Sequence, residues 1–377
     1  MQKRIYYNQK VLKHAELYLN AYGTLMVYGP PGSGKTYLGL YLAEKYGYDL
    51  EVLTGKESLR DEDMMGTFRI VLGEEGKAVP VWVDGPLARA FKKAANGKKV
   101  LLLIDEITRI PTRYLNVFIE VLNNYDPDYY VFYNHLTGET LKAPKENLAF
   151  FATANVNQVG TNEVPEALLD RFASYLYVSF PSLEEEVSIL KRWGVSEETA
   201  YVFAKFAQVT RRMHEEGALE FPVSTRCLVS LAKAVKKALE GSTASGFERE
   251  VRIGMELLKG QLPYLTGSVT GNVDWEEKAQ ILLDLYLKVY QEVYEELKRS
   301  KTQKSKPEGL TPKTLKEELE SISAELPSFE AKSVKEESVK EEREEKSEAD
   351  KKQSSEKQSS EKQNSEKKKK NVNVLVI

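Results

Sequence analysis

The segment GPPGSGKT, from Gly29 to Thr36, has the residue types and spacing of a phosphate-binding loop. Its glycines allow successive backbone N–H groups to turn inward around phosphate oxygens, at the positive end of the helix that follows. The Lys35 ammonium would neutralise the β- and γ-phosphates, and the Thr36 hydroxyl would be a Mg²⁺ ligand. The residues before Lys35 that would cradle the phosphates are Gly29, Pro30, Pro31, Gly32, Ser33 and Gly34. The pattern predicts a site for ATP and Mg²⁺, and the alternative is a glycine-rich turn with a surface lysine.

A second chemical signal is the segment VLLLIDE, in which two carboxylates follow an apolar run from Val100 to Ile104. Ligands bind outside the carboxyl ends of parallel strands, which is where these carboxylates would emerge. Asp105 would hold Mg²⁺ through water, and Glu106 would polarise the attacking water as a general base or an orienting group. Alone, such a run is often a plain strand end, but its place after a phosphate-binding loop favours the catalytic interpretation.

Four apolar segments that could position these groups alternate with helical stretches through residues 1–180, at 24–29, 49–55, 99–106 and 148–155. Near-continuous apolar strands separated by helices indicate a parallel sheet that is covered on both faces. The expected fold class is therefore α/β, a P-loop αβα sandwich. The segments 67–83 and 130–144 break this rhythm and are expected to be two inserted β-hairpins, the second turning at Thr137-Gly138.

From Pro181 to about residue 300, apolar residues recur at three- and four-residue spacing, which predicts a helical lid and C-terminal helices over 181–300. Ser182, Ser196 and Ser224 stand where N-caps are expected. Residues 301–377 are a charged, low-complexity tail that is too polar to order itself. The tail ends in apolar NVNVLVI, which is either a docking strand on a flexible tether or an unused terminus.

Composition excludes several classes of protein. The formal net charge is -3 and the pI is about 6.0, so the whole chain has no general attraction to nucleic acid or to an anionic membrane. Cys227 is the single cysteine, which rules out an internal disulfide. No apolar run is long enough to span a bilayer, and a cytoplasmic protein is expected.

In chain order, the segments GPPGSGKT, DGPLARAF, LLLIDEITR, FATANVN, PEALLDRF and STR resemble the AAA+ family of ATPases. The resemblance covers residues of about 20 to 240 and is strongest to the MoxR-like and dynein-related branch, which includes CbbQ, NorQ and GvpN-type proteins. It implies an ATP-hydrolysing motor that assembles as a homo-oligomeric ring, expected to be a hexamer.

The resemblance also implies roles for three further residues. Asn155 in ATAN matches the sensor-1 residue, which helps to position water against the γ-phosphate; a turn residue at a strand end is the alternative. Arg171 in LLDRF matches the arginine finger that reaches a neighbouring subunit's nucleotide; a surface salt bridge is the alternative. Arg226 in STR matches the sensor-2 arginine at the start of a lid helix; a helix-surface arginine is the alternative. For Arg109, an interface role and a salt bridge both stay open.

Three functions fit these features. The leading one is a chaperone that remodels or assembles a protein partner, since related proteins often work with von Willebrand factor A-type partners. The second is a nucleic-acid translocase, a helicase or a McrB-like NTPase subunit, which would grip phosphates with basic hairpin tips. The tips at 73–79 and 134–140 carry glutamates and a single lysine, which favours a protein substrate. The third is a nucleotide-gated assembly scaffold that hydrolyses ATP poorly, and the complete set of catalytic residues argues against it.

Overall fold

The computed structural model describes residues 4–72, 78–123, 125–155, 162–240, 246–271 and 274–302. Apart from residues 215–218, these residues belong to one compact unit. Most of the first hairpin tip, at 73–77, and the tail from residue 303 onward lie outside the described residues. The predictions for the tail, and the domain boundary at residue 180, stay predictions.

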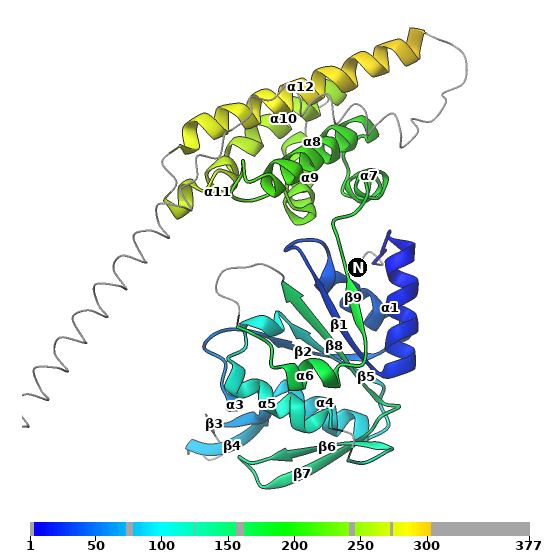
Figure 1. The fold of residues 1–377 in the computed structure, drawn as a ribbon, viewed down its shortest axis with the longest axis vertical. Coiled ribbons are helices and arrows are strands. Elements are labelled where there is room, and N and C mark those ends of the chain that lie inside the picture. The colour runs from blue at the N-terminus through cyan, green and yellow to red at the C-terminus, as the bar shows by residue number, and fades with distance from the viewer. Residues whose placement is uncertain are drawn as a thin grey trace, which may run out of the picture. The chain divides into compact units, whose positions relative to one another are not determined.

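A five-stranded parallel sheet forms the centre of the α/β part (Figure 1). Its strands, in spatial order, are β2 (Asp49–Thr54), β5 (Val100–Asp105), β8 (Leu148–Asn155), β1 (Thr24–Gly29) and β9 (Tyr175–Tyr177). The predicted α/β class and all four predicted strands are confirmed. The fifth strand, β9, was not predicted, because three residues are too short to show a periodic pattern.

Helices cover both faces of this sheet (Figure 1). On one face, α1 (Gln9–Tyr22) and α2 (Lys35–Tyr46) pack their apolar side chains against the sheet. The other face is covered by α3 (Asp61–Met65), α4 (Pro86–Ala95), α5 (Thr112–Val121) and α6 (Glu166–Arg171). Strands β5 and β8 lie inside the sheet and are buried along almost their whole length, as their apolar sequences require.

Both predicted hairpins are present as two-stranded antiparallel sheets. The first pairs β3 (Gly66–Leu72) with β4 (Ala78–Asp84), and the second pairs β6 (Tyr129–Asn134) with β7 (Glu139–Pro144). Gly138 turns the second hairpin with a φ of 74°, a conformation that glycine adopts without steric cost. A short 3₁₀ helix, η1 (Ile107–Arg109), follows β5.

The chain after residue 181 is helical, as predicted. Its elements are α7 (Leu183–Arg192), α8 (Glu197–Glu215), α9 (Thr225–Leu239), α10 (Phe247–Lys259), α11 (Leu262–Leu265), η2 (Ser268–Thr270) and α12 (Trp275–Thr302). The predicted caps are confirmed: the hydroxyls of Ser182, Ser196 and Ser224 each accept a hydrogen bond from a backbone N–H in the first turn of α7, α8 and α9. Within the described ranges, no helix is both long and apolar enough to cross a membrane.

The cap of α7 makes a testable contribution to stability. Ser182 and Glu185 form a reciprocal capping box, so Ser182→Ala leaves a backbone N–H without its acceptor. We expect the free energy of unfolding, measured by urea titration, to fall by about 1 kcal/mol. Ser182→Asp keeps an acceptor and should unfold like the parent protein; equal destabilisation by both substitutions would contradict this role.

Candidate functional site

The carboxyl ends of β1, β5 and β8 bring the predicted motifs to one edge of the sheet. The parallel register pairs Gly29 with Asn155, and Ile104, just before the two carboxylates, with Ala152. A cavity of about 510 Å³ opens at this edge, within the range of small-molecule sites. Of the predicted site residues, it is lined by Pro31, Gly32, Ser33, Gly34, Lys35, Thr36, Asp105, Glu106, Asn155 and Arg226.

Lys35 is a buried cation in the wall of this cavity. Its Nζ donates hydrogen bonds to the carbonyl oxygens of Gly29 (2.9 Å) and Pro30 (2.7 Å), both in the same loop. Burial lowers the pKa of Lys35 to about 8, an effect that the Asp105 carboxylate opposes and the nearby Arg226 guanidinium reinforces. The ammonium is therefore incompletely compensated, and an anion placed beside it would stabilise the charged form.

Asp105 is held by hydroxyl groups from two other elements. Its Oδ1 accepts a hydrogen bond from Thr36 Oγ1 at the start of α2 (2.7 Å) and another from Thr153 Oγ1 on β8 (2.7 Å). Thr153 was not predicted as a site residue. It lies two positions before Asn155 on the same strand, and residues at that spacing share one face of a strand. This two-residue spacing from Asn155 is the feature of the sequence that could have predicted Thr153 as a site residue.

Glu106 has an unusual backbone conformation, with a φ of 57°. It is the one non-glycine residue with a positive φ among those described, and such strain commonly marks functional positions. Its N–H donates to Thr153 Oγ1 (2.9 Å), and Gly55 approaches so closely that a Cβ there would lie 2.1 Å from the Glu106 carbonyl oxygen. Its carboxylate forms a salt bridge with Arg109 (3.3 Å), so within this chain Arg109 has the salt-bridge role.

The residues present fit a phosphate group and its metal ion. Ser33 Oγ is buried and has no hydrogen-bond partner in the described structure, so it is available to a ligand. Gly34 has a φ of 97°, and the space where a Cβ would stand is open. The oxygen atoms of Thr36 and Asp105 are the kind of ligand that Mg²⁺ prefers.

The two predicted arginines differ in position. Arg226 is the second residue of α9 and lines the cavity. Arg171, the last residue of α6, is not among the residues that line it. Its NH1 donates to the carbonyl oxygen of Ala167 (2.6 Å), and its Nε is buried without a partner in the described structure. The lining of the cavity in this chain thus includes Asp105 and Asn155 at the strand ends but not the predicted residues Gly29, Pro30 and Arg171.

Several lining residues outside the motifs were also missed. The segment Ile5–Asn8, before α1, and the pair Trp193 and Lys233, on the helical side, line the cavity. Lys233 Nζ stands 3.9 Å from the centroid of the Trp193 ring. The side chain of Tyr6 is buried, which raises its pKa above the ordinary value. No motif marks these residues, because they meet only when the chain folds.

Two family descriptions match the chain. Residues 24–172 match the AAA domain of the dynein-related subfamily. Residues 184–247 match the C-terminal region of CbbQ, NirQ and NorQ proteins. The first range contains the phosphate loop, both carboxylates, Asn155 and Arg171, and the second contains Arg226.

Known proteins and solved structures are similar to more than half of the chain. An uncharacterized protein of Staphylococcus aureus (strain NCTC 8325 / PS 47) is 30% identical over 216 residues, which make up 56% of this chain and 77% of that protein. One of Staphylococcus haemolyticus (strain JCSC1435) is 28% identical over 242 residues, covering 62% and 87% respectively. A solved structure, the RuvB Holliday junction branch migration motor of Thermotoga maritima, is 17% identical with a TM-score of 0.43, over 67% of this chain and 70% of that one.

The Thr153 hydroxyl gives a prediction for the site. Thr153→Val keeps the shape of the side chain but leaves the Glu106 N–H without an acceptor and removes a donor from Asp105. We expect the free energy of unfolding to fall by about 1–3 kcal/mol, since an unsatisfied buried group costs that much. Thr153→Ser retains the hydroxyl and should lose less than half of that amount. Urea unfolding of the two variants measures the difference, and equal losses would show that the hydroxyl is not what matters.

Proposed function

The chain belongs to the dynein-related subfamily of AAA ATPases, with a CbbQ/NirQ/NorQ C-terminal region, and from this premise we propose that it is an ATP-hydrolysing ring motor that remodels or assembles a protein partner. The observation that carries the proposal is the meeting of Lys35, Asp105, Glu106, Asn155 and Arg226 around one cavity. They come from four separate parts of the chain, α2, the end of β5, β8 and α9, so their convergence supports a shared role in one reaction.

The phosphate loop would bind the nucleotide through its backbone N–H groups and the Lys35 ammonium. Mg²⁺, when bound, would neutralise phosphate charge as it develops. Thr36 and Asp105 would hold it, and the hydrogen bond between them keeps both oxygens on the same side of the cavity. Thr153 supports this arrangement by donating to the same carboxylate oxygen.

Glu106 would take a proton from the attacking water, and Asn155 would orient that water. Two contacts hold Glu106 in place for this step, because the Thr153 hydroxyl accepts its N–H and Arg109 pairs with its carboxylate. A strained backbone that is fixed from several directions is typical of a residue kept ready for reaction. Arg226 would contact the terminal phosphate from the helical side of the cavity.

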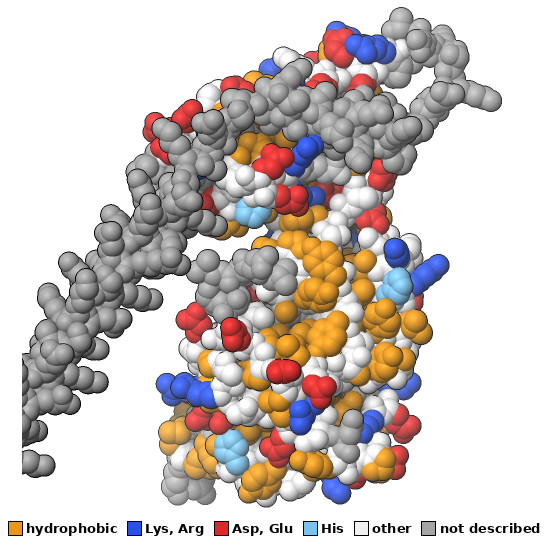
Figure 2. All heavy atoms as spheres, viewed as in Figure 1, with side chains coloured by type: hydrophobic (Ala, Val, Ile, Leu, Met, Phe, Trp, Pro, Cys, Tyr) orange, Lys and Arg blue, Asp and Glu red, His pale blue; other side chains and the backbone are white. Residues whose placement is uncertain are grey.

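A ring is supported by two features of the chain. Arg171 does not line the cavity of its own chain, as expected of a residue that acts on the nucleotide of a neighbouring subunit. The strand after it, β9, pairs only with β1 among the described strands, and Tyr175 and Tyr177 on it are exposed. In Figure 2, apolar side chains gather in the region where Figure 1 draws β9. Exposed apolar surface of this kind favours contact with another protein chain. We propose a hexamer in the cytoplasm.

A protein substrate is supported by the second hairpin. Its tip, residues 134–140, contains one glutamate and neither lysine nor arginine. A tip that grips nucleic acid would need positive charge to neutralise phosphates.

The first functional prediction concerns nucleotide binding and turnover. Lys35→Ala should abolish ATP binding, because it removes the positive charge from the phosphate cradle. Glu106→Gln should bind ATP but lose hydrolysis, since an amide keeps the shape and cannot accept the proton. Calorimetric titration and phosphate release measure the two effects. Hydrolysis by Glu106→Gln at the parent rate would exclude Glu106 as the residue that activates water.

The second functional prediction is that the active site is shared. Arg171→Ala should reduce turnover by on the order of 10³-fold, the magnitude typical of supplied arginines, with a smaller loss of ATP affinity. Mixing it with Lys35→Ala should restore part of the activity, because some interfaces then combine an intact Arg171 with an intact Lys35. Continued inactivity of subunits proven to mix would count against an arginine acting between chains.

The third functional prediction identifies the class of partner. The Glu106→Gln chain loaded with ATP should retain its substrate during affinity capture, and Lys35→Ala, which should not load ATP, is the matched control. We expect a protein that is enriched with Glu106→Gln and absent with Lys35→Ala. Recovery of nucleic acid alone would overturn the protein-remodelling role and favour a translocase.

A further inference from the structure

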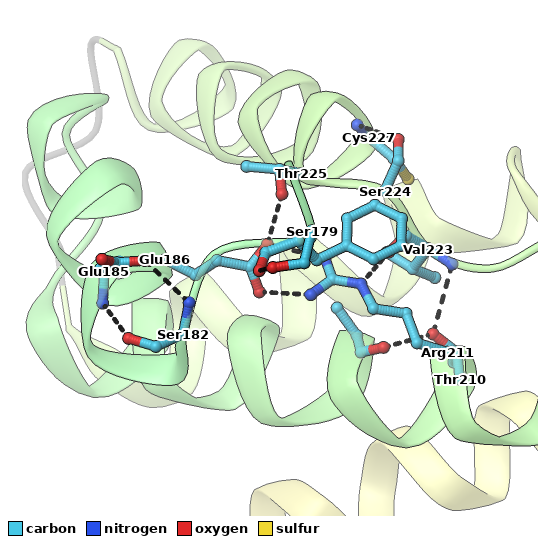
Figure 3. Close-up of polar contacts among 12 residues, drawn as sticks. Ser179, Ser182, Glu185, Glu186, Thr210, Arg211, Val223, Ser224, Thr225 and Cys227 are labelled. Atoms are coloured by element: carbon cyan, nitrogen blue, oxygen red, sulfur yellow. Dashed lines mark hydrogen bonds and ion pairs between the residues drawn. The ribbon is translucent and has the colours of Figure 1, made fainter. Parts of the chain in front are cut away.

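A buried ion pair lies in the helical part, outside the motifs of the site. Arg211 on α8 and Glu186 on α7 form two parallel hydrogen bonds, of 2.7 and 3.0 Å, between guanidinium and carboxylate (Figure 3). The Glu186 residue is fully buried and Arg211 is nearly so. Burying two charges costs several kcal/mol per ion before their attraction is counted, so apolar residues of similar size could stabilise the same packing. The pair therefore calls for an explanation beyond stability.

The ion pair is hydrogen-bonded to the segment that leads into α9. Arg211 Nε donates to the carbonyl oxygen of Val223 (2.9 Å), and Glu186 accepts from Thr225 Oγ1 (2.6 Å) (Figure 3). The Val223 N–H also donates a hydrogen bond, to Oγ1 of Thr210 (3.3 Å), the residue that precedes Arg211 on α8. Residues 223–225 are thus fixed through a backbone N–H, a backbone carbonyl and a side-chain hydroxyl.

The segment 223–225 leads directly into the wall of the nucleotide cavity. Thr225 and Arg226 line the cavity, and Ser224 caps α9. Ser224 also lies against the phosphate loop, since a Cβ on Gly32 would stand 2.6 Å from Ser224 Cβ. Gly32, with a φ of 76°, is therefore needed both for its backbone conformation and for this close approach.

The same guanidinium contacts the chain where it enters the helical part. The Phe180 ring stacks against Arg211, with the guanidinium carbon 4.0 Å from the ring centroid. Phe180 lies between Ser179 and Pro181, and both of these line the cavity. Arg211 thus contacts the entry segment of the helical part, α7 and the segment that leads into α9.

We propose that Arg211 is a positioning residue, which holds the start of α9 so that Arg226 can meet the terminal phosphate of bound ATP. This inference rests on the proposed function, in which Arg226 contacts that phosphate. A lysine cannot replace Arg211 here, because an ammonium lacks the planar fork that binds both Glu186 oxygens while Nε binds Val223.

The test is a double-mutant cycle on the preference for ATP over ADP. All variants carry Glu106→Gln, so that ATP is bound without turnover, and dissociation constants for ATP and ADP are measured with the full chain. We expect Arg226→Ala and Arg211→Lys each to lower the preference by about tenfold, a typical coupling between linked sites. The double variant should lose no more than Arg226→Ala alone, because Arg211 acts only through Arg226.

Lys205→Met is the matched control for loss of stability. Lys205 lies on the same helix, is also buried and pairs with Glu292 (3.0 Å), but it does not line the cavity. The Lys205→Met substitution should lower the melting temperature of the protein and leave its preference for ATP over ADP unchanged. Thr210→Val is a second variant in case Arg211→Lys does not fold: Thr210 does not line the cavity, and its loss frees the Val223 N–H, which should lower the preference by a smaller factor.

The outcomes separate the inference from the proposed function. An unchanged ATP preference in folded Arg211→Lys, while Arg226→Ala loses it, overturns the positioning role alone. Losses that multiply in the double variant overturn it too, because they indicate independent effects. An unchanged preference in Arg226→Ala removes the proposed role of Arg226 and the inference with it. Absence of ATP binding in the Glu106→Gln parent would overturn the proposed function itself.

Discussion

The site depends on the hydrogen bonds that the Asp105 carboxylate accepts from two hydroxyl groups, those of Thr36 and Thr153. Thr36 lies in the first turn of the helix after β1, and Thr153 lies on β8. Their hydrogen bonds to one oxygen of Asp105 therefore join three neighbouring strands at their carboxyl ends. Thr153 also accepts the Glu106 N–H and holds that residue in its left-handed conformation. A single small side chain therefore orients the proposed metal ligand and the proposed base together.

Two of the buried cations in the described part of the chain, Lys35 and Arg211, differ in how completely they are compensated. Lys35 is paired mainly with loop carbonyls, and its pKa falls to about 8, which leaves the site with an affinity for negative charge. Arg211 is bound by a carboxylate, a carbonyl and an aromatic face. An incompletely compensated charge suits a residue that receives a ligand, and a charge paired with a carboxylate suits a residue that holds other elements in place.

Local signals were enough to predict most of the fold and the motifs. Apolar runs predicted the strands that contain VLLLID and LAFFATAN. Serines predicted the helix caps, and the spacing of glycines predicted the phosphate loop. Features that depend on contacts between distant segments could not be predicted in this way. Strand β9 is too short for a pattern. The alternation with Asn155 indicates the face of the strand on which Thr153 lies but not its hydrogen-bond partners, and Arg211 meets Glu186 across two helices.

A complete active site requires a second copy of the chain in this account, since Arg171 is not among the residues that line its own cavity. The most direct test is the ATPase rate per subunit, measured over a range of protein concentrations while sedimentation reports the oligomeric state. We expect the rate per subunit to rise as monomers assemble and to level off once rings predominate. A constant rate from a protein that remains monomeric at every concentration would contradict the account.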